Sequence, residues 1–451
     1  MADWFKKVFG CTENDRAAGI KLEKMGDLPL LRCGTRTYLP GTFYCPTLKE
    51  IRKDAMETAK DFFVKNKTVW REKFPNQVNI KNLENLNVMD ALGNSYYQEC
   101  IFQVASQTNC LEHPHSGVNP ELGITDYYKD KTQGPACSIA CPAGTYVRNW
   151  HGLPKDKPQT RNTQISLLGK LAKKIKNKDS LGSYKFFSEQ NGYVLVTRTQ
   201  KKNLKKLFNR LQEQEKFNSD ILDNIQIGVM EDTEVLCSGT LDKIKIYKYE
   251  PNPDKKFTVT QAFCSAVSLE STYNKRDKHS IDILAKAILD AQYESLLWLA
   301  VKNACDTGKN SVFLTLVGGG VFENPIEWIQ SSITRAINII KKFGFPLTIY
   351  IIHYGKVPHH GFYAIEGLSC DYDSGDGLVD FSPVKQRKLQ GDISSEKVLH
   401  KIDDCRMKLA KLSKKVIKNA GKGKTKYSKK KMEPLLTCQK GMKKLVKKKI
   451  I

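Results

Sequence analysis

Between Phe257 and His353, short runs of apolar residues alternate with longer segments in which apolar residues have helical spacing. The short runs predict strands at Phe257–Ser265, Ser311–Val317 and Leu347–His353, and the longer segments predict helices at Ile281–Ala304 and Pro325–Phe343. Strands and helices that alternate at this length are typical of a parallel sheet with right-handed crossovers. The pattern therefore predicts an α/β fold, with a mixed or parallel sheet flanked by helices.

The N-terminal half of the chain is less regular. Lys49–Phe74 has apolar residues at helical spacing, so we expect residues 1–75 to form a largely helical lead-in that packs on the main domain. Asn76–Pro158 is rich in Asn, Gly, Pro and Cys, and loops this elaborate usually carry function. Further along, the pattern predicts a charged helix with a strand on either side, at Lys201–Glu215, Gly192–Thr197 and Ile244–Tyr249.

Basic residues are concentrated at the C-terminus. The 451 residues carry a formal net charge of +25, and Arg406–Ile451 holds 18 Lys or Arg against one acid, Glu433. A tail of this kind is expected to attract phosphates non-specifically, to act as a nuclear-import signal, or to be a solubilising extension. We therefore expect four parts, which are the helical lead-in (1–75), a main α/β domain (76–360), an acidic loop and connection (361–400), and a flexible or helical Lys-rich tail (401–451).

The sequence predicts neither a membrane segment nor export. Its longest apolar runs are far shorter than the ~20 residues that span a bilayer. The opening MADWFKKVFG lacks the apolar core and cleavage site of a signal peptide. The 13 cysteines are odd in number and form no pair of CxxC motifs. We expect reduced thiols, no metal and no cofactor, in an intracellular protein of the cytoplasm or nucleus that has no membrane partner.

A glycine-rich turn gives the clearest local signal. In VFLTLVGGGVFENPIEW (Val312–Trp328), a strand runs into Gly318, Gly319 and Gly320, followed by Asn324 as the expected N-cap and Pro325 as the first helical residue. Without Cβ atoms, the backbone N–H groups of such a turn can approach a diphosphate, and the following helix favours negative charge. The alternative is a tight turn without a ligand. The turn lacks the features of a P-loop or a GxGxxG fingerprint, which disfavours an NTPase or a Rossmann dehydrogenase.

A second segment, Ala105–Asn149, places amides and carboxylates among small residues. Such residues suit a buried polar pocket, because small residues let a ligand approach while amides and carboxylates read its hydroxyls and amines. A surface loop with Asx turns is the alternative interpretation. The polar residues are Gln107, Asn109, Glu112, Glu121, Asp126, Asp130, Thr132, Gln133, Arg148 and Asn149.

Cys264 ends the strand that contains TQAFCS. A nucleophilic thiol needs a paired histidine, and no histidine stands at a motif spacing from Cys264. We therefore interpret it as a buried core cysteine.

Several segments also carry a family resemblance. They are SQTNCLE (106–112), DxTQGPAC (130–137) with AGTYVRN (143–149), TQAFCSA (260–266) and VFLTLVGGGVFENPxxWI (312–329). These segments resemble the MavL-type arginine ADP-ribosylhydrolases, a macrodomain-related family, and the likeness runs from Asp3 to about Tyr354. One departure is that the family often has an acid at the position of Leu122, whereas the neighbouring acid here is Glu121.

The resemblance implies a macrodomain-like ADP-ribose-binding domain in residues 76–360. The glycine loop would hold the diphosphate and distal ribose, and the two polar elements would face that ribose and the scissile bond. Cleavage of an N-glycosidic bond to arginine needs one carboxylate to activate water or hold hydroxyls, and another can bind the guanidinium. Asp130 is the first choice for the former role, and Glu112, Glu121 and Asp126 remain candidates for the latter. The implied binding residues are Gln107, Asn109, Thr132, Gln133, Gly318, Gly319, Gly320, Val321 and Phe322.

The leading hypothesis from the sequence is thus a metal-free hydrolase that removes ADP-ribose from arginine on a protein, with ubiquitin among the candidate substrates. One alternative is a non-catalytic reader of ADP-ribose, which would use the same glycine loop. Another is a nucleic-acid-associated protein that acts through the Lys-rich tail, by non-specific contacts. Turnover distinguishes a hydrolase from a reader, and truncation of the tail tests the third hypothesis.

Overall fold

The computed structural model describes residues 4–26, 28–66, 78–84, 86–238, 245–246, 256–269 and 281–355. The chain divides into two units, 1–381 and 382–451, and every described residue belongs to the first. The acidic loop (361–400) and the Lys-rich tail (401–451) lie outside the described residues. Among the described helices, none is both long and apolar enough to cross a membrane.

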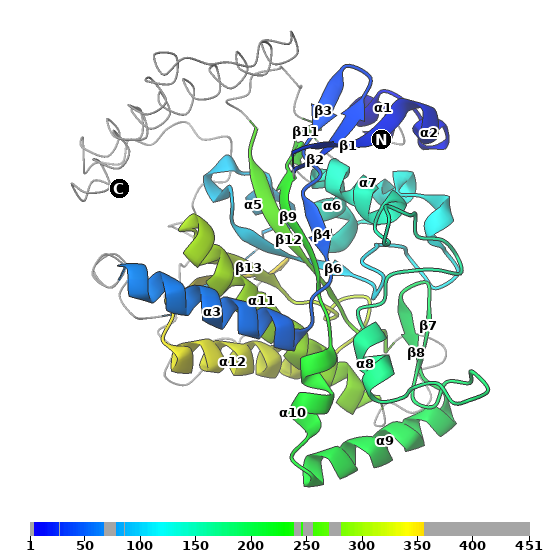
Figure 1. Ribbon diagram of the computed structural model, residues 1–451, viewed down its shortest axis with the longest axis vertical. Coiled ribbons are helices and arrows are strands. Elements are labelled where there is room, and N and C mark those ends of the chain that lie inside the picture. The colour runs from blue at the N-terminus through cyan, green and yellow to red at the C-terminus, as the bar shows by residue number, and fades with distance from the viewer. Residues whose placement is uncertain are drawn as a thin grey trace. The chain divides into compact units, whose positions relative to one another are not determined.

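A seven-stranded mixed sheet forms the centre of the first unit (Figure 1). Five of its strands run parallel in the order β12-β6-β13-β14-β5, while β9 is antiparallel to both β12 and β4. The predicted α/β class is confirmed, and the three strands predicted after Phe257 form within two residues of the expected bounds. The seven strands are β4 (Thr42–Tyr44), β5 (Asn79–Leu83), β6 (Ile101–Ser106), β9 (Gly228–Glu234), β12 (Thr258–Ser265), β13 (Ser311–Thr315) and β14 (Thr348–Ile352).

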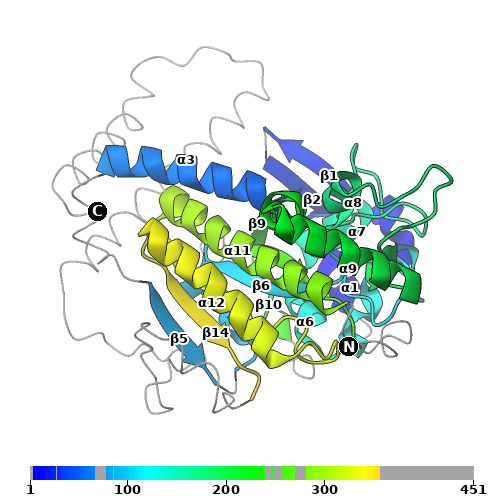
Figure 2. The same ribbon diagram turned by 90° about the horizontal axis from the view of Figure 1, so that it is seen from below.

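Helices cover both faces of this sheet. One face packs against α3 (Leu48–Asn66), α11 (Asp282–Thr307) and α12 (Ile326–Phe343), which lie side by side (Figure 2). The other face packs against shorter helices, α5 (Val88–Leu92), α6 (Gln133–Ala140) and α7 (Pro142–Trp150). Alternate strand residues point to opposite faces. Ile101 and Val312 join the first core, and Phe102 and Phe313 join the second.

The N-terminal segment differs from the prediction. Short helices α1 (Trp4–Phe9) and α2 (Arg16–Gly19) precede an antiparallel sheet of β1 (Ile20–Met25), β2 (Leu28–Cys33) and β3 (Arg36–Tyr38). The expected helical lead-in is therefore wrong for residues 20–44, although Leu48–Asn66 is helical as predicted. Glycine explains part of the difference, because Gly34, with φ of +59°, turns the chain between β2 and β3.

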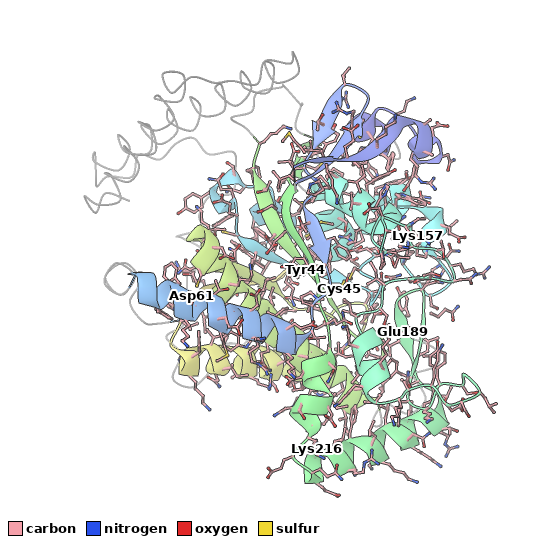
Figure 3. The ribbon with its side chains drawn as sticks, in the orientation of Figure 1. Tyr44, Cys45, Asp61, Lys157, Glu189 and Lys216 are labelled. Atoms are coloured by element: carbon pink, nitrogen blue, oxygen red, sulfur yellow. The ribbon has the colours of Figure 1, made fainter. Side chains whose placement is uncertain are left out.

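A smaller lobe lies between α7 and β9 along the chain. It contains α8 (Gly169–Lys174), the hairpin β7 (Ser188–Gln190) and β8 (Tyr193–Leu195), α9 (Arg198–Glu213) and α10 (Phe217–Asp220). The predicted charged helix is α9, and Thr197 and Gln200 form a capping box at its start. Glu189 (Figure 3) ties the hairpin to neighbouring loops by accepting hydrogen bonds from Thr108 and Ser166 at 2.5 and 2.6 Å. Of the strand predicted at 244–249, the described part is β11 (Lys245–Ile246), paired with β10 (Cys237–Ser238).

Candidate functional site

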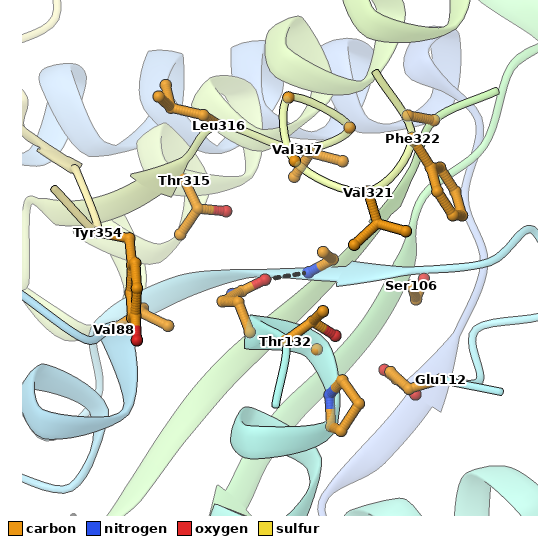
Figure 4. Close-up of a pocket in the computed structure, with 18 of the residues that line it drawn as sticks. Val88, Ser106, Glu112, Thr132, Thr315, Leu316, Val317, Val321, Phe322 and Tyr354 are labelled. Atoms are coloured by element: carbon orange, nitrogen blue, oxygen red, sulfur yellow. Dashed lines mark hydrogen bonds between the residues drawn. The ribbon is translucent and has the colours of Figure 1, made fainter. Parts of the chain in front are cut away.

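A cavity of about 630 Å³ opens at the carboxyl ends of the parallel strands β6, β13 and β14 (Figure 4). Strands β6 and β13 pair only where they begin, at Ile101 with Val312 and Phe102 with Phe313. Beyond this point their backbones no longer form a ladder, so space opens between them toward their carboxyl ends. Open α/β sheets bind their ligands at this edge.

Two glutamine side chains complete the backbone hydrogen bonds that these strands lose. The Gln133 Oε1 accepts from the Ala105 N–H, its Nε2 donates to the Gln103 carbonyl, and both distances are 2.8 Å. The Gln103 Oε1 in turn accepts from the Thr315 N–H at 2.9 Å. Gln133 was predicted to bind ligand. Its amide bonds to β6, and this contact fixes the start of α6 beside the cavity. Its binding to a ligand stays a prediction.

The glycine loop forms one wall of the cavity. Gly318 has φ of +82°, and a Cβ there would lie 2.5 Å from the Cβ of Ala266, so only glycine fits. The Asn324 Nδ2 closes the loop by donating to the carbonyls of Val267 and Gly318, at 2.9 and 3.2 Å. Helix α12 begins at Ile326 with Pro325 as its N-cap. The prediction that Asn324 is the N-cap is therefore wrong, because its side chain bonds to carbonyls of the loop and not to the start of the helix.

Beyond Gly318, the loop presents unused hydrogen-bond donors. No described residue accepts a hydrogen bond from the N–H groups of Gly320, Val321 or Phe322. A Cβ placed on Gly320 would meet no atom within 4 Å, so this part of the backbone is open to a ligand. Successive free N–H groups in a turn form an anion-binding concavity. The loop is therefore suited to a phosphate group.

Glu112 lies across the cavity from this loop and is buried. Neither of its carboxylate oxygens has a hydrogen-bond partner among the described residues. Its nearest cation is the fully buried Arg148, whose Nη2 lies 3.5 Å from Oε2 and donates to the Ser138 Oγ at 3.0 Å. Burial raises the pKa of Glu112 to about 7, against the opposing effect of Arg148. The carboxyl group is thus able to take up and release a proton near neutral pH.

Asp130 contributes a second carboxylate to the cavity. The residue is half-buried, and its Oδ1 accepts from the Thr132 N–H at 2.9 Å in an Asx turn that leads into α6. Its negative charge adds to the raised pKa of Glu112. Gly134 lets α6 approach closely, because a Cβ there would lie 2.7 Å from the Glu112 Cγ. The DxTQG element therefore places both carboxylates in one cavity.

His113 and Tyr193 complete this end of the cavity. Burial lowers the pKa of His113 to about 4, so its imidazole is neutral at physiological pH. The Tyr193 hydroxyl donates to the His113 carbonyl at 2.9 Å. Gln107 also lines the cavity, but its amide binds the N–H and carbonyl of His113, at 3.0 Å each, and so shapes the loop.

Three predicted site residues lie outside the cavity. Asn109 is buried, and its side chain bonds to Gln164 and to the Leu111 N–H. Glu121 is exposed and accepts from the Arg161 N–H at 3.1 Å, and Asp126 is exposed and pairs with Lys129 at 2.8 Å. The remaining predicted residues line the cavity, namely Gln107, Glu112, Asp130, Thr132, Gln133, Gly318, Gly319, Gly320, Val321 and Phe322.

Some cavity residues were not predicted from the sequence. His113 directly follows Glu112, so its place next to a predicted site residue could have indicated that it lies in the site. Tyr193 reaches the site from the β7–β8 hairpin, and Tyr354 from the end of β14, and neither stands near a motif. Cys264 is buried as expected, and burial raises its pKa to about 12, which confirms the core interpretation. Among the described residues, no cluster of three His, Cys, Asp or Glu side chains could hold a metal ion.

Comparison with known proteins finds no matching family model and no matching curated protein. Solved structures with a similar course of the chain include poly(ADP-ribose) glycohydrolase from Deinococcus radiodurans in complex with ADP-ribose. It is 10% identical with a TM-score of 0.35, over 72% of this chain and 92% of that chain. The enzyme from Thermomonospora curvata is 10% identical with a TM-score of 0.33, over 81% and 98%. These scores are low, so the function of this chain is inferred from the geometry of its own cavity.

Proposed function

We propose that the cavity binds ADP-ribose and that the protein is a hydrolase that releases it from arginine side chains of protein substrates. The proposal rests on one juxtaposition. A loop whose three N–H groups donate to no described residue, and which suits a phosphate, faces the same cavity as Glu112. Glu112 is a buried carboxyl group that accepts no hydrogen bond from the described residues and has Arg148 at 3.5 Å. Buried carboxyl groups without hydrogen bonds cost stability and are typical of functional sites.

The shape of the cavity supports an extended ligand. Figure 4 shows Tyr354 and Val88 at one end and Glu112 at the other, with Val317, Val321 and Phe322 of the glycine loop along the upper side and across from Glu112. An adenine ring would contact the apolar end, where the exposed Tyr354 offers an aromatic face. The diphosphate would accept hydrogen bonds from Gly320, Val321 and Phe322, and the distal ribose would then lie beside Glu112 and Asp130.

The chemistry requires a proton to move twice. Glu112 as a carboxylate takes a proton from water while the oxygen of this water bonds to the anomeric carbon of the ribose. The bond from that carbon to the guanidinium nitrogen breaks through an oxocarbenium-like state, and arginine leaves as a neutral guanidine. Glu112 then returns the proton to it. Asp130 would hold the ribose hydroxyls or the guanidinium. This assignment gives the proton transfer to Glu112 and not to Asp130, the first choice from the sequence, because Glu112 is buried and its pKa is raised to about 7.

A panel of peptides with ADP-ribose on arginine, serine or glutamate, together with poly(ADP-ribose), tests this proposal. We expect free ADP-ribose to be released from the arginine peptide at the highest kcat/KM. Release from another linkage would keep the hydrolase and reject arginine specificity. Tight binding of ADP-ribose without release from any substrate would show a reader and reject the enzyme.

A further inference from the structure

The exposed face of α9 carries a row of positive side chains that winds gradually around the helix. Arg198, Lys202, Lys206 and Arg210 are all exposed and follow one another at intervals of four residues. Residues four apart lie on the same side of a helix, about 6 Å apart along its axis. The opposite face holds Leu204, Leu207, Phe208 and Leu211 in the core, so the helix cannot rotate to change which side chains it presents.

This arrangement costs the helix stability. Like charges four residues apart repel each other. Positive charges in the first turn, such as Arg198, also oppose the helix dipole, whose N-terminal end is itself positive. Among the described residues no carboxylate pairs with any of the four cations, and Glu213 at the last position is the only acid in the helix. The described residues therefore supply no carboxylate that compensates the row.

Neighbouring segments extend the positive surface. Asn203 of α9 donates to the Lys185 carbonyl at 3.0 Å, which holds that exposed lysine beside the helix. Lys216 follows α9 (Figure 3). Between Gly169 and Lys216 the sequence has thirteen Lys or Arg and only four acids. The charge therefore belongs to the whole lobe that contains α9.

We propose that the exposed row on α9 is a docking surface for the phosphate backbone of nucleic acid. A phosphate backbone presents negative charges at regular intervals, which a row of regularly spaced cations can contact. The exposed face of α9 carries no aromatic side chain, so the contact positions the strand and does not read its bases. The row belongs to a different part of the sequence from the Lys-rich tail, and the proposal does not depend on the hydrolase reaction.

The test compares full-length proteins by anisotropy with a short labelled DNA duplex over a range of salt concentrations. The variant R198Q/K202Q/K206Q/R210Q keeps helix-forming side chains and the tail, and removes only the row. We expect binding at low salt to weaken about tenfold or more. The slope of log K against log salt is negative, and it should become less steep by about 3 to 4, since each phosphate contact contributes about 0.9.

The control K21Q/K24Q/K49Q/K60Q removes the same net charge from exposed positions on β1 and α3. It should change the slope by less than one contact. Equal losses in both variants would overturn the proposal, as would an equal loss of polyglutamate binding, which would indicate an acidic protein partner. A matching RNA duplex compares the two nucleic acids, and a selective loss on either supports the surface. If the quadruple variant melts at a lower temperature, K202Q/K206Q should still reduce the slope by about 2.

Discussion

Two buried glutamates of this protein have opposite surroundings. Glu294 of α11 and Glu112 beside β6 both have side chains that are 2% exposed. Glu294 accepts from Arg52 at 2.8 Å, from Arg335 at 2.7 Å and from the Trp298 indole at 3.2 Å. Glu112 accepts no hydrogen bond from any described residue. Burial alone therefore does not distinguish a structural carboxylate from a functional one, and hydrogen-bond partners do.

The difference follows from what lies around each group. Arg52 and Arg335 come from α3 and α12, so Glu294 joins the three helices that cover one face of the sheet. Arg148 is also a buried cation, but it lies over the Phe263 ring at 3.7 Å and donates to Ser138, which leaves it 3.5 Å from Glu112. Glu112 thus lines the cavity with neither oxygen hydrogen-bonded to a described residue, and burial raises its pKa to about 7.

The largest effect is expected at Glu112 itself. Glu112→Gln keeps the shape of the side chain but removes the group that takes the proton, so turnover on arginine-linked substrate should fall by on the order of 10²- to 10⁴-fold. Binding of ADP-ribose, measured by calorimetry, should change much less. Glu121→Gln is the matched control, because that glutamate is exposed and outside the cavity. Near-normal turnover in a folded Glu112→Gln protein would remove Glu112 from the mechanism.

Glu294→Ala should have the reverse outcome. The substitution leaves Arg52 and Arg335 without their shared carboxylate, and removing one partner of a buried ion pair costs about 3–5 kcal/mol of folding free energy. Urea denaturation should show this loss, while turnover per folded molecule stays close to that of the wild type. A stable variant would mean that the network contributes little. A stable variant with low turnover would mean that Glu294 acts on the site.

A smaller effect is expected in the glycine loop, where the structure separates three neighbouring glycines. A Cβ on Gly318 would meet Ala266 at 2.5 Å, one on Gly319 would meet the flexible end of Ile329 at 3.0 Å, and one on Gly320 would meet nothing. Gly318→Ala should therefore distort the loop and weaken ADP-ribose binding by about tenfold, roughly 1.4 kcal/mol. Gly320→Ala should leave the melting temperature unchanged. Equal affinities in the wild type and a folded Gly318→Ala variant would contradict the assignment of the loop.

The alternating pattern predicted β12, β13, β14 and the glycine loop because those signals are local. Strands β1, β2 and β3 were missed although they pair locally, with Met25 opposite Leu28 and Cys33 opposite Arg36. Only one residue of β1 is buried, so no clear alternation of apolar and polar positions indicates a strand there. The sequence left the choice among the acids open. Composition does not distinguish Glu112 from Glu121 or Asp126, because their exposure is set by how the loop is held.

A distant residue holds that loop. The Glu13 carboxylate accepts from the N–H groups of Ile124 and Thr125 and from the Trp150 indole, at 2.8 to 3.0 Å. Gly123 permits this approach, because a Cβ there would lie 2.4 Å from the Glu13 Cδ. More than one hundred residues separate Glu13 from this loop, so the sequence around the motif could not reveal the contact.

The smallest effect concerns the pH dependence of the reaction. Because Glu112 must be a carboxylate to accept a proton and its pKa is raised to about 7, kcat/KM should rise about tenfold per pH unit below pH 7 and then level off. The charge of Asp130 contributes to that raised pKa, so Asp130→Asn should move the midpoint to lower pH, by less than about one unit. Asp126→Asn is the control, since Asp126 is exposed and paired with Lys129 outside the cavity. A midpoint that stays in place, or moves equally in both variants, would mean that the two carboxylates do not interact in the working enzyme.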